Sequence, residues 1–169
     1  MKRIVLLLSF ALIGIAAFSQ VQYEVKVEGP DKILKGILSR DLVQKDPAFT
    51  WFAQNQQGYV PNADAVTALK SKPGLRFIVF GGTWCDDTKN ILPKFYSLTD
   101  AAAVPTENIS LIGVDRSKKT LGNLSESLNV INVPTVIVLK DGKEIGRVVE
   151  YGKTGQWDKE IGEIVSKVN

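Results

Sequence analysis

The chain has 169 residues, of which 44% are hydrophobic and 23% are charged, a composition typical of a globular domain long enough to bury a core. Its 21 basic and 18 acidic residues give a net charge of +3, which is too small to favour nucleic acid as a partner. It contains no histidine, which excludes Ser/His/Asp and Cys/His catalysis and removes the commonest metal ligand.

Residues 1–19 have the pattern of a secretory signal peptide. Lys2 and Arg3 form a basic start, an apolar stretch follows as far as Phe18, and small residues stand at positions 17 and 19. We expect cleavage before Gln20, a periplasmic or secreted protein, and no membrane attachment after cleavage. Loss of the two basic residues leaves 19 basic against 18 acidic ones, so the net charge falls to +1. The alternative is an uncleaved membrane anchor, because the apolar run is only slightly shorter than the roughly 20 residues that span a bilayer.

Residues 20–62 are predicted to form an N-terminal extension with helical structure. Five apolar residues of the segment "ILKGILSRDLVQKD" recur at helical spacing: Ile33, Leu34, Ile37, Leu38 and Leu42. The aromatic residues at positions 49, 51, 52 and 59 are expected to pack against the edge of a core rather than to bind a ligand.

Residues 63–169 are predicted to form the main domain, in which strands and helices alternate. The segment "NADAVTALKSK" is typical of a helix that is capped by Asn62 and ended by Pro73. The apolar run "LRFIVFG" predicts a strand covered on both faces, and "TKNILPKFYSL" predicts the helix that follows it.

The second half of this domain continues the alternation. "ISLIGVD" indicates another buried strand and "LGNLSESLN" a helix, while Asp141-Gly142 between two β-rich runs indicates a hairpin. "TGQWDKEIGEIVSKV" has helical spacing and predicts the last helix. The fold class predicted from this order is α/β, with a mixed central sheet and helices on both faces.

Cys85 is the only cysteine of the chain, and it lies between the first strand of this domain and its helix. A single cysteine cannot form an internal disulfide, so its thiol is free, capped by a small thiol, or bonded to another chain. The start of a helix favours the reactive thiolate, and the hydroxyl of Thr88 can donate a hydrogen bond to it. The charges of Asp86 and Asp87 act in the opposite direction, and the sequence does not decide the balance. The alternative is a buried, inert cysteine, although the polar residues after Cys85 favour an accessible one.

At this point the sequence resembles the thioredoxin superfamily. "FIVFGGTWCDDTKNILPKF" is similar to the strand, the Trp-Cys-x-x-Cys motif and the active-site helix of thioredoxins, with Trp84, Cys85 and Pro93 at matching positions. Pro134 matches the cis-proline that thioredoxins place beside the thiol. The resemblance covers residues 63–169 and implies a thioredoxin-like fold. "GTWCDDTK" and "GVDRSKK" resemble bacterial secreted thioredoxin-like proteins with a Trp-Cys-x-Asp-[Ser/Thr] motif.

The resemblance implies a site with Cys85 and Thr88 as catalytic residues, and with Trp84, Val133 and Pro134 as the substrate-binding surface. Proline cannot donate a backbone hydrogen bond, so the backbone at Val133 is left free to pair with an extended substrate peptide. The sequence also departs from the family. Thr88 stands where thioredoxins have their second cysteine, and residue 79 is a valine where they have a buried aspartate.

Two hypotheses of function follow. The first is thiol-disulfide exchange through Cys85 in the bacterial cell envelope, by a monothiol oxidoreductase or isomerase that lacks a resolving cysteine. The second is a redox-silent thioredoxin-fold module that binds peptides or proteins beside Pro134. Whether the protein is an enzyme is therefore left open. The expected partners are thiols and disulfides of proteins or small molecules, and we expect no cofactor, no metal site, and a monomer.

Overall fold

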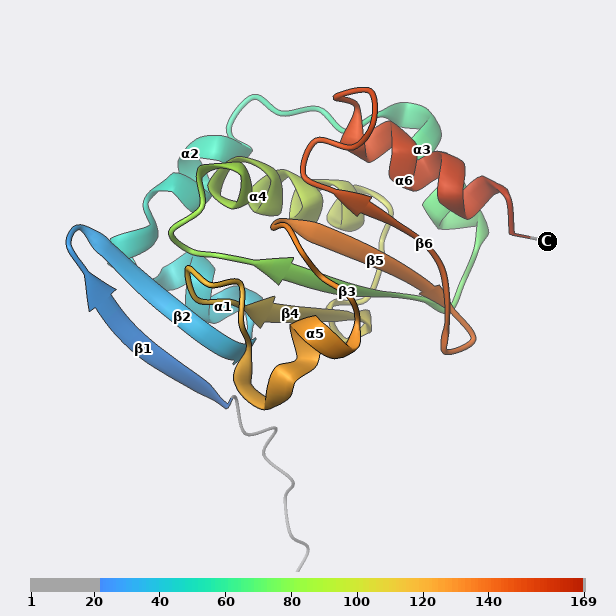
Figure 1. The fold of residues 1–169 in the computed structure, drawn as a ribbon. Helices are drawn as coiled ribbons and strands as arrows, with labels where there is room; N and C mark the ends of the chain where they lie inside the picture. The colour runs from blue at the N-terminus through green and yellow to red at the C-terminus, as the bar shows by residue number, and fades with distance from the viewer. Residues whose placement is uncertain (1–21, 169) are drawn as a thin grey trace, which may run out of the picture.

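A computed structural model describes residues 22–168 as a six-stranded mixed sheet with helices on both of its faces (Figure 1). The strands lie in the order β1-β2-β4-β3-β5-β6. Their bounds are Tyr23–Glu28 for β1, Asp31–Leu38 for β2, Leu75–Gly81 for β3, Ile109–Gly113 for β4, Thr135–Lys140 for β5 and Lys143–Val149 for β6. The predicted signal peptide lies outside the described residues.

Helices supply the two outer layers. Their bounds are Arg40–Lys45 for α1, Trp51–Gln56 for α2, Ala63–Ser71 for α3, Asp86–Ala101 for α4, Leu124–Ser127 for α5 and Trp157–Ser166 for α6. Short 3₁₀ turns cover Pro47–Phe49 (η1), Thr106–Asn108 (η2) and Leu121–Asn123 (η3). Figure 1 shows α2, α3, α4 and α6 on one side of the sheet and α5 on the other.

The central strands β3 and β4 run parallel, and every other neighbouring pair in the sheet is antiparallel. Alternate residues of β3 enter different hydrophobic clusters. Leu75, Phe77 and Val79 pack under α4 and α6, whereas Phe80 packs toward α5. This two-sided burial explains why the strand reads as a nearly continuous apolar run. The predicted α/β class, with a mixed sheet and helices on both faces, is confirmed.

Local signals placed most of the elements of the main domain correctly. The side chain of Asn62 accepts a hydrogen bond from Ala65 N at 3.0 Å and caps α3 as predicted. The turn between β5 and β6 holds Asp141 and Gly142 with φ angles of 51° and 76°, as a tight hairpin requires. The aromatic side chains of the extension pack as expected, with Phe49 and Phe52 buried in the core.

The helix predicted from Ile33 to Leu42 is wrong as far as Leu38, because residues 31–38 form strand β2. Leu34 and Leu38 are four residues apart, and this spacing fits both one face of a helix and one face of a strand. The strand is favoured because the edge of β4 is open to pair with it, and because Gly36 has a φ of 123° that no helix contains. The extension is therefore a β-hairpin, β1–β2, followed by the short helices α1 and α2.

Glycine is required where β2 meets β4. Gly36 lies opposite Gly113, and a Cβ atom on Gly113 would lie 2.3 Å from Leu34 O. The two backbones therefore approach too closely for a side chain, and the hairpin joins the sheet at a fixed register. None of the helices within residues 22–168 has the length and apolar character needed to cross a membrane.

Candidate active site around Cys85

Cys85 is the residue immediately before α4, in the N-cap position. Its backbone N–H donates to Gly82 O at 2.9 Å, and its carbonyl accepts from Lys89 N at 2.9 Å. Its side chain makes no capping hydrogen bond and is half-buried. The sulfur therefore lies at the N-terminal end of α4 and is not used to cap the helix.

The Cys85 thiol donates to the backbone carbonyl of Val133, with an Sγ to O distance of 3.3 Å. The sheet explains the contact, because Phe80 at the end of β3 lies opposite Thr135 at the start of β5. The residues after β3 therefore lie beside the residues before β5. The Val133–Pro134 peptide bond is cis, and both residues are buried.

The segment around Pro134 is fixed by its own hydrogen bonds. Thr135 Oγ1 donates to Asn132 O at 2.7 Å, and Pro134 O accepts from Glu150 N at 2.7 Å. Lys118 Nζ donates to Asn132 Oδ1 at 2.8 Å. No hydrogen bond of the Val133 N–H is found among the described residues. The segment thus holds the carbonyl that meets the thiol in place.

Thr88 lies one turn into α4, and its side chain is fully buried. Its Oγ1 accepts from Gly82 N at 3.2 Å, and its Cγ2 would lie 2.8 Å from a Cβ atom on Gly81. Thr88 therefore ties the start of α4 to the end of β3. No bond between its hydroxyl and Cys85 Sγ is present within residues 22–168, so that expected contact stays a prediction.

Trp84 is half-buried beside the thiol, and its ring is held from three sides. Its Nε1 donates to Val114 O at 3.1 Å. A Cβ atom on Gly82 would lie 2.7 Å from the ring, so the ring covers the backbone of that glycine. The guanidinium of Arg116 lies over the ring, with a distance of 5.4 Å from Cζ to the ring centroid. The orientation of the indole is set before any ligand arrives.

The β1–β2 hairpin contacts the same loop through Thr83. The Thr83 hydroxyl donates to Lys32 O at 2.8 Å and accepts from Leu34 N at 3.1 Å. The side chain of Thr83 is buried, with 4% of its surface exposed. Its hydroxyl therefore bonds to one backbone carbonyl and one backbone N–H of β2, as the backbone of a neighbouring strand would. Thr83 lies two residues before Cys85 in the sequence.

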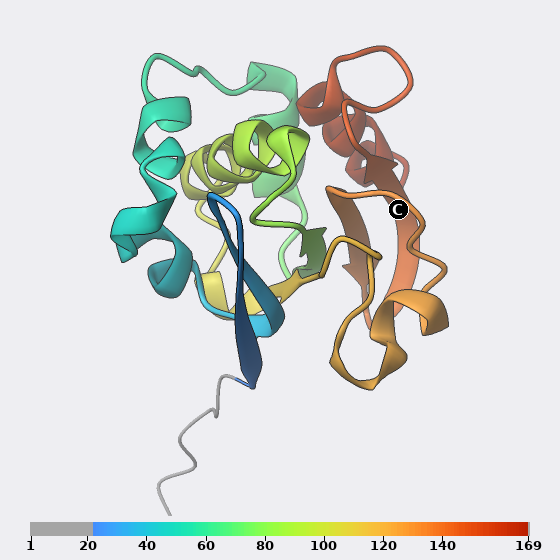
Figure 2. The ribbon, with the colours of Figure 1, turned by 60° about the vertical axis from the view of Figure 1, so that its left-hand side comes forward.

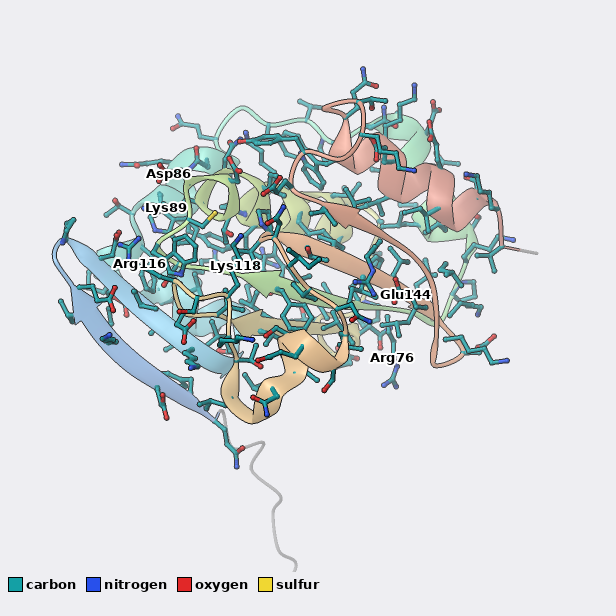
Figure 3. All side chains as sticks on the ribbon, viewed as in Figure 1. Arg76, Asp86, Lys89, Arg116, Lys118 and Glu144 are labelled. Atoms are coloured by element: carbon teal, nitrogen blue, oxygen red, sulfur yellow. The ribbon has the colours of Figure 1, made fainter. Side chains whose placement is uncertain are left out.

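Ion pairs join the tip of the hairpin to the loop after β4 and to α4. Arg116 binds Glu28 at 3.0 Å and also binds Asp31, while Lys89 lies 3.5 Å from Asp31 and 3.2 Å from Asp86. Figure 3 shows the labelled side chains of Asp86, Lys89 and Arg116 beside the hairpin. These pairs are partly exposed and contribute little individually, but together they set the position of the hairpin tip.

Asp115 lies in the loop after β4 and binds Lys35 of β2 at 2.7 Å. Burial by itself raises the pKa of Asp115, but hydrogen bonds from Lys35 and from the backbone N–H groups of Lys119 and Ser117 outweigh it. The pKa of Asp115 is therefore lowered from its usual range. This carboxylate serves the hairpin contact, and it remains charged at neutral pH.

The buried polar side chains of residues 22–168 are all hydroxyls: Thr83, Thr88, Thr99, Thr120, Ser125 and Thr135. Val79, in the position of the thioredoxin aspartate, is 1% exposed and packs in the core under α4. No buried acid or base within the described part of the chain is thus available to move a proton beneath Cys85. The same residues hold no group of three or more side chains arranged for a metal ion.

Of the residues named from the sequence, the structure brings Val133 O to Cys85 Sγ and packs Trp84 in the same cluster, while the substrate-binding roles of Trp84, Val133 and Pro134 stay predictions. Sequence reasoning missed Thr83, Arg116 and the hairpin. Arg116 had a usable signal, because the carboxyl ends of the parallel strands β3 and β4 meet at one edge of the sheet, and Arg116 follows β4. Thr83 had none, because its partners lie about fifty positions away in a segment predicted as a helix.

Comparison with known proteins identifies the family. The model of the thioredoxin family, described as "Thioredoxin", matches residues 61–163. The chain belongs to the thioredoxin family. It is 34% identical over 88 residues to a thioredoxin of Chlamydia pneumoniae, a match that covers 52% of this chain and 76% of the relative. It is 32% identical over 94 residues to a thioredoxin of Echinococcus granulosus, covering 56% and 82% of the two chains.

Among solved structures, the reduced form of thioredoxin 2 from Pseudomonas aeruginosa PAO1 is similar, with a TM-score of 0.40 and 23% identity over 65% of this chain and 96% of that one. Membership of the thioredoxin family supports a function in thiol-disulfide chemistry in general. The family match begins at residue 61, so the β1–β2 hairpin and helices α1 and α2 lie outside it. In this thioredoxin-family protein the active-site loop is therefore held by a segment that lies outside the family match.

Proposed function

We propose that this protein carries out thiol-disulfide exchange through Cys85 as a monothiol. The observation that carries the proposal is the position of Sγ, half-exposed at the start of α4 and 3.3 Å from Val133 O. In the reaction the Cys85 thiolate forms a bond to one sulfur of a substrate disulfide. The other sulfur leaves as a thiolate and takes up a proton from solvent.

The mixed disulfide is released by a thiol from outside the chain. Cys85 is the only cysteine, and the threonine in the position of the second one has no sulfur to offer. When a second cysteine of the substrate attacks, the substrate disulfide is rearranged and Cys85 returns to the thiol form. When a small thiol attacks, a cap is transferred from the substrate to that small thiol. Neither route changes the total number of disulfides, so Cys85 needs no external oxidant or reductant.

We assign Trp84 and the backbone at Val133 and Pro134 to the surface that meets the substrate, because the side chains of Val133 and Pro134 are themselves buried. Trp84 is held beside the thiol by Val114 O and by Arg116, so its ring loses little conformational entropy on binding. An extended peptide that approaches Cys85 finds the free N–H of Val133 as a hydrogen-bond donor. Thr88 is buried in the first turn of α4, and we assign its hydroxyl to support of the Cys85 thiolate.

The place of action is the bacterial cell envelope, in the periplasm or outside the cell. The pattern of residues 1–19 supports this location, because it combines a basic start, an apolar stretch and a small-residue cleavage site. The motif "GTWCDDTK" supports it further through its resemblance to secreted single-cysteine proteins. Detection of the chain starting at Gln20 in a periplasmic fraction, and its absence from the cytoplasm, tests the location.

Trapping of mixed disulfides tests the reaction. Wild-type protein is expected to collect disulfide-linked substrates in its own compartment, which appear as reducible bands on non-reducing gels, and Cys85→Ser is expected to collect none. Thr88→Cys is the matched variant, because it restores a second cysteine at the family position and should release the trapped substrates. Equal banding of wild type and Cys85→Ser, or no reducible band from either, would show that Cys85 does not exchange.

A redox-silent binding module is the second candidate, and the burial of Val79 and Thr88 favours it. The buried acid of a thioredoxin is replaced by Val79, which packs in the core, and its second cysteine is replaced by Thr88, whose hydroxyl accepts a hydrogen bond from Gly82 N. Alkylation of Cys85 in the native protein discriminates between the candidates. An alkylation rate no faster than that of a free cysteine peptide, together with peptide binding that survives Cys85→Ser, would favour the module.

A further inference from the structure

Strand β1 is the outer edge of the sheet, and within residues 22–168 no strand covers its far side (Figures 1 and 2). Its apolar side chains are exposed, with 37% for Tyr23, 51% for Val25 and 72% for Val27. An exposed edge with alternating apolar residues is a template for pairing with another strand. The packing of residues 22–168 therefore leaves much of the apolar face of β1 uncovered.

The backbone N–H and C=O groups of β1 face β2 and the open edge in alternation along the strand. Gln22 O accepts from Ile37 N at 2.8 Å, so Gln22 belongs to a hydrogen-bonded pair with β2. In an antiparallel pair such residues alternate, so the N–H and C=O groups of Glu24, Lys26 and Glu28 face β2. The N–H and C=O groups of the three residues between them face away from the sheet. These are Tyr23, Val25 and Val27, the residues with the exposed side chains.

We propose that β1 pairs with β1 of a second copy of this chain, antiparallel and centred on Val25. A two-fold axis through Val25 then joins the two six-stranded sheets into one continuous sheet. Val25 lies opposite Val25 of the second copy, and Tyr23 lies opposite Val27. Each of these residues donates and accepts one backbone hydrogen bond across the interface, so the open edge is fully paired.

The charges select this register over its neighbours. Centred on Val25, the pairing places Glu24 opposite Lys26 of the second copy on both sides of the axis, and opposite charges at such positions are stabilising. A register shifted by two residues places either Glu24 opposite Glu24 or Lys26 opposite Lys26, and both are like-charge contacts. A register shifted by one residue would bring together backbone groups that already bond to β2.

We choose a second copy over a foreign peptide as the partner of this edge, because the strand is complementary to itself in three respects. The strand Tyr23–Glu28 is complementary to itself in backbone pairing, in its apolar face and in charge. The proposed dimer differs from the monomer that the sequence led us to expect. It uses none of the residues around Cys85, so it stands or fails independently of the proposed exchange reaction.

Sedimentation velocity of residues 20–169 in reducing buffer, over a range of concentrations up to about 1 mM, tests the dimer, because an interface of this size is weak. Wild type is expected to form dimers as the concentration rises. Glu24→Lys and Lys26→Glu each create like-charge pairs and should weaken the dimer by ~10-fold or more, since two cross-strand pairs change sign. The double variant restores opposite charges and should restore the dimer.

Val25→Pro is the second variant, because it removes an outward N–H and leaves the hydrogen bonds to β2 in place. It should sediment as a monomer with an unchanged far-ultraviolet circular dichroism spectrum. A wild type that is monomeric at every concentration overturns the proposal. So does a dimer that persists in Val25→Pro, or a double charge variant that stays as weak as the single ones. A wild type that stays monomeric but captures an extended peptide at β1 overturns it in favour of a foreign partner.

Discussion

Replacement of Thr83 by valine tests whether the hairpin holds the active-site loop through a single hydroxyl. The valine keeps the shape of the side chain and removes the bonds to Lys32 O and Leu34 N. Leu34 is fully buried, so water cannot replace the lost acceptor, and an unsatisfied buried group costs about 1–3 kcal/mol. Lys32 is partly exposed as a residue, so its carbonyl is expected to recover a bond to water.

The expected loss is about 2–4 kcal/mol, of which about 1–3 kcal/mol comes from the unsatisfied N–H of Leu34 and a net ~1 kcal/mol from the lost bond to Lys32 O. For a domain of this size the melting temperature should fall by about 5–15 °C, at roughly 2–4 °C for each kcal/mol. Urea unfolding followed by circular dichroism measures the free energy directly. Thr83→Ser is the matched control, since it keeps the hydroxyl and should lose only about 1 kcal/mol with the methyl group.

Thr67→Val is a second control, because the Thr67 hydroxyl is exposed and bonds only within α3; it should change stability by less than about 0.5 kcal/mol. If Thr83→Val were as stable as Thr83→Ser, the hydroxyl would not hold the hairpin. The hairpin would then be attached by packing and by ion pairs alone.

Three further substitutions test the surroundings of the thiol. Gly82→Ala places a Cβ atom 2.7 Å from the Trp84 ring and should destabilise the protein by about 1–3 kcal/mol in urea unfolding; a neutral result would mean that the ring moves freely. Arg116→Gln removes the cation over the same ring and should lower stability by about 1 kcal/mol, less at high salt, whereas a salt-independent loss would contradict the charge effect. The lowered pKa of Asp115 means that its contribution is complete above its ordinary pKa of 3.8 and is lost as the pH falls through the folded value. Asp115→Asn should therefore show a smaller drop in the urea midpoint between about pH 5 and pH 2.5 than wild type, and an equal drop would exclude the contact with Lys35.

The main domain could be predicted from the sequence because the residues that start its helices and form its turns act through local backbone preferences. Asn62 and Gly142 mark a helix start and a hairpin turn through their own backbone preferences, whatever the rest of the chain does. The hairpin β1–β2 could not be predicted in this way. The spacing of Leu34 and Leu38 fits two periods, and the choice between them depends on the free edge of β4, which is some seventy residues away in the sequence.

The residues of the site also separate into those that the sequence predicts and those whose contacts depend on distant segments. Cys85 and Pro134 were found because a family resemblance covers both and places them together. Thr83 and the tip of the hairpin were not found, since their contacts with the loop exist only once β2 has joined the sheet. A hydroxyl that pairs with a distant strand leaves no local pattern, because threonine also occurs in turns and strands where it has no such partner.

The partner of the Cys85 thiol is an atom of the main chain. Every amino acid at position 133 would present the same carbonyl oxygen, so no substitution there can delete the contact, and only a shift of the backbone can. Saturation mutagenesis of position 133 would consequently alter the bulk beside the sulfur while its acceptor stays constant. The side chain at position 133, which is buried beside Cys85, can therefore change in evolution without removing the acceptor of the thiol.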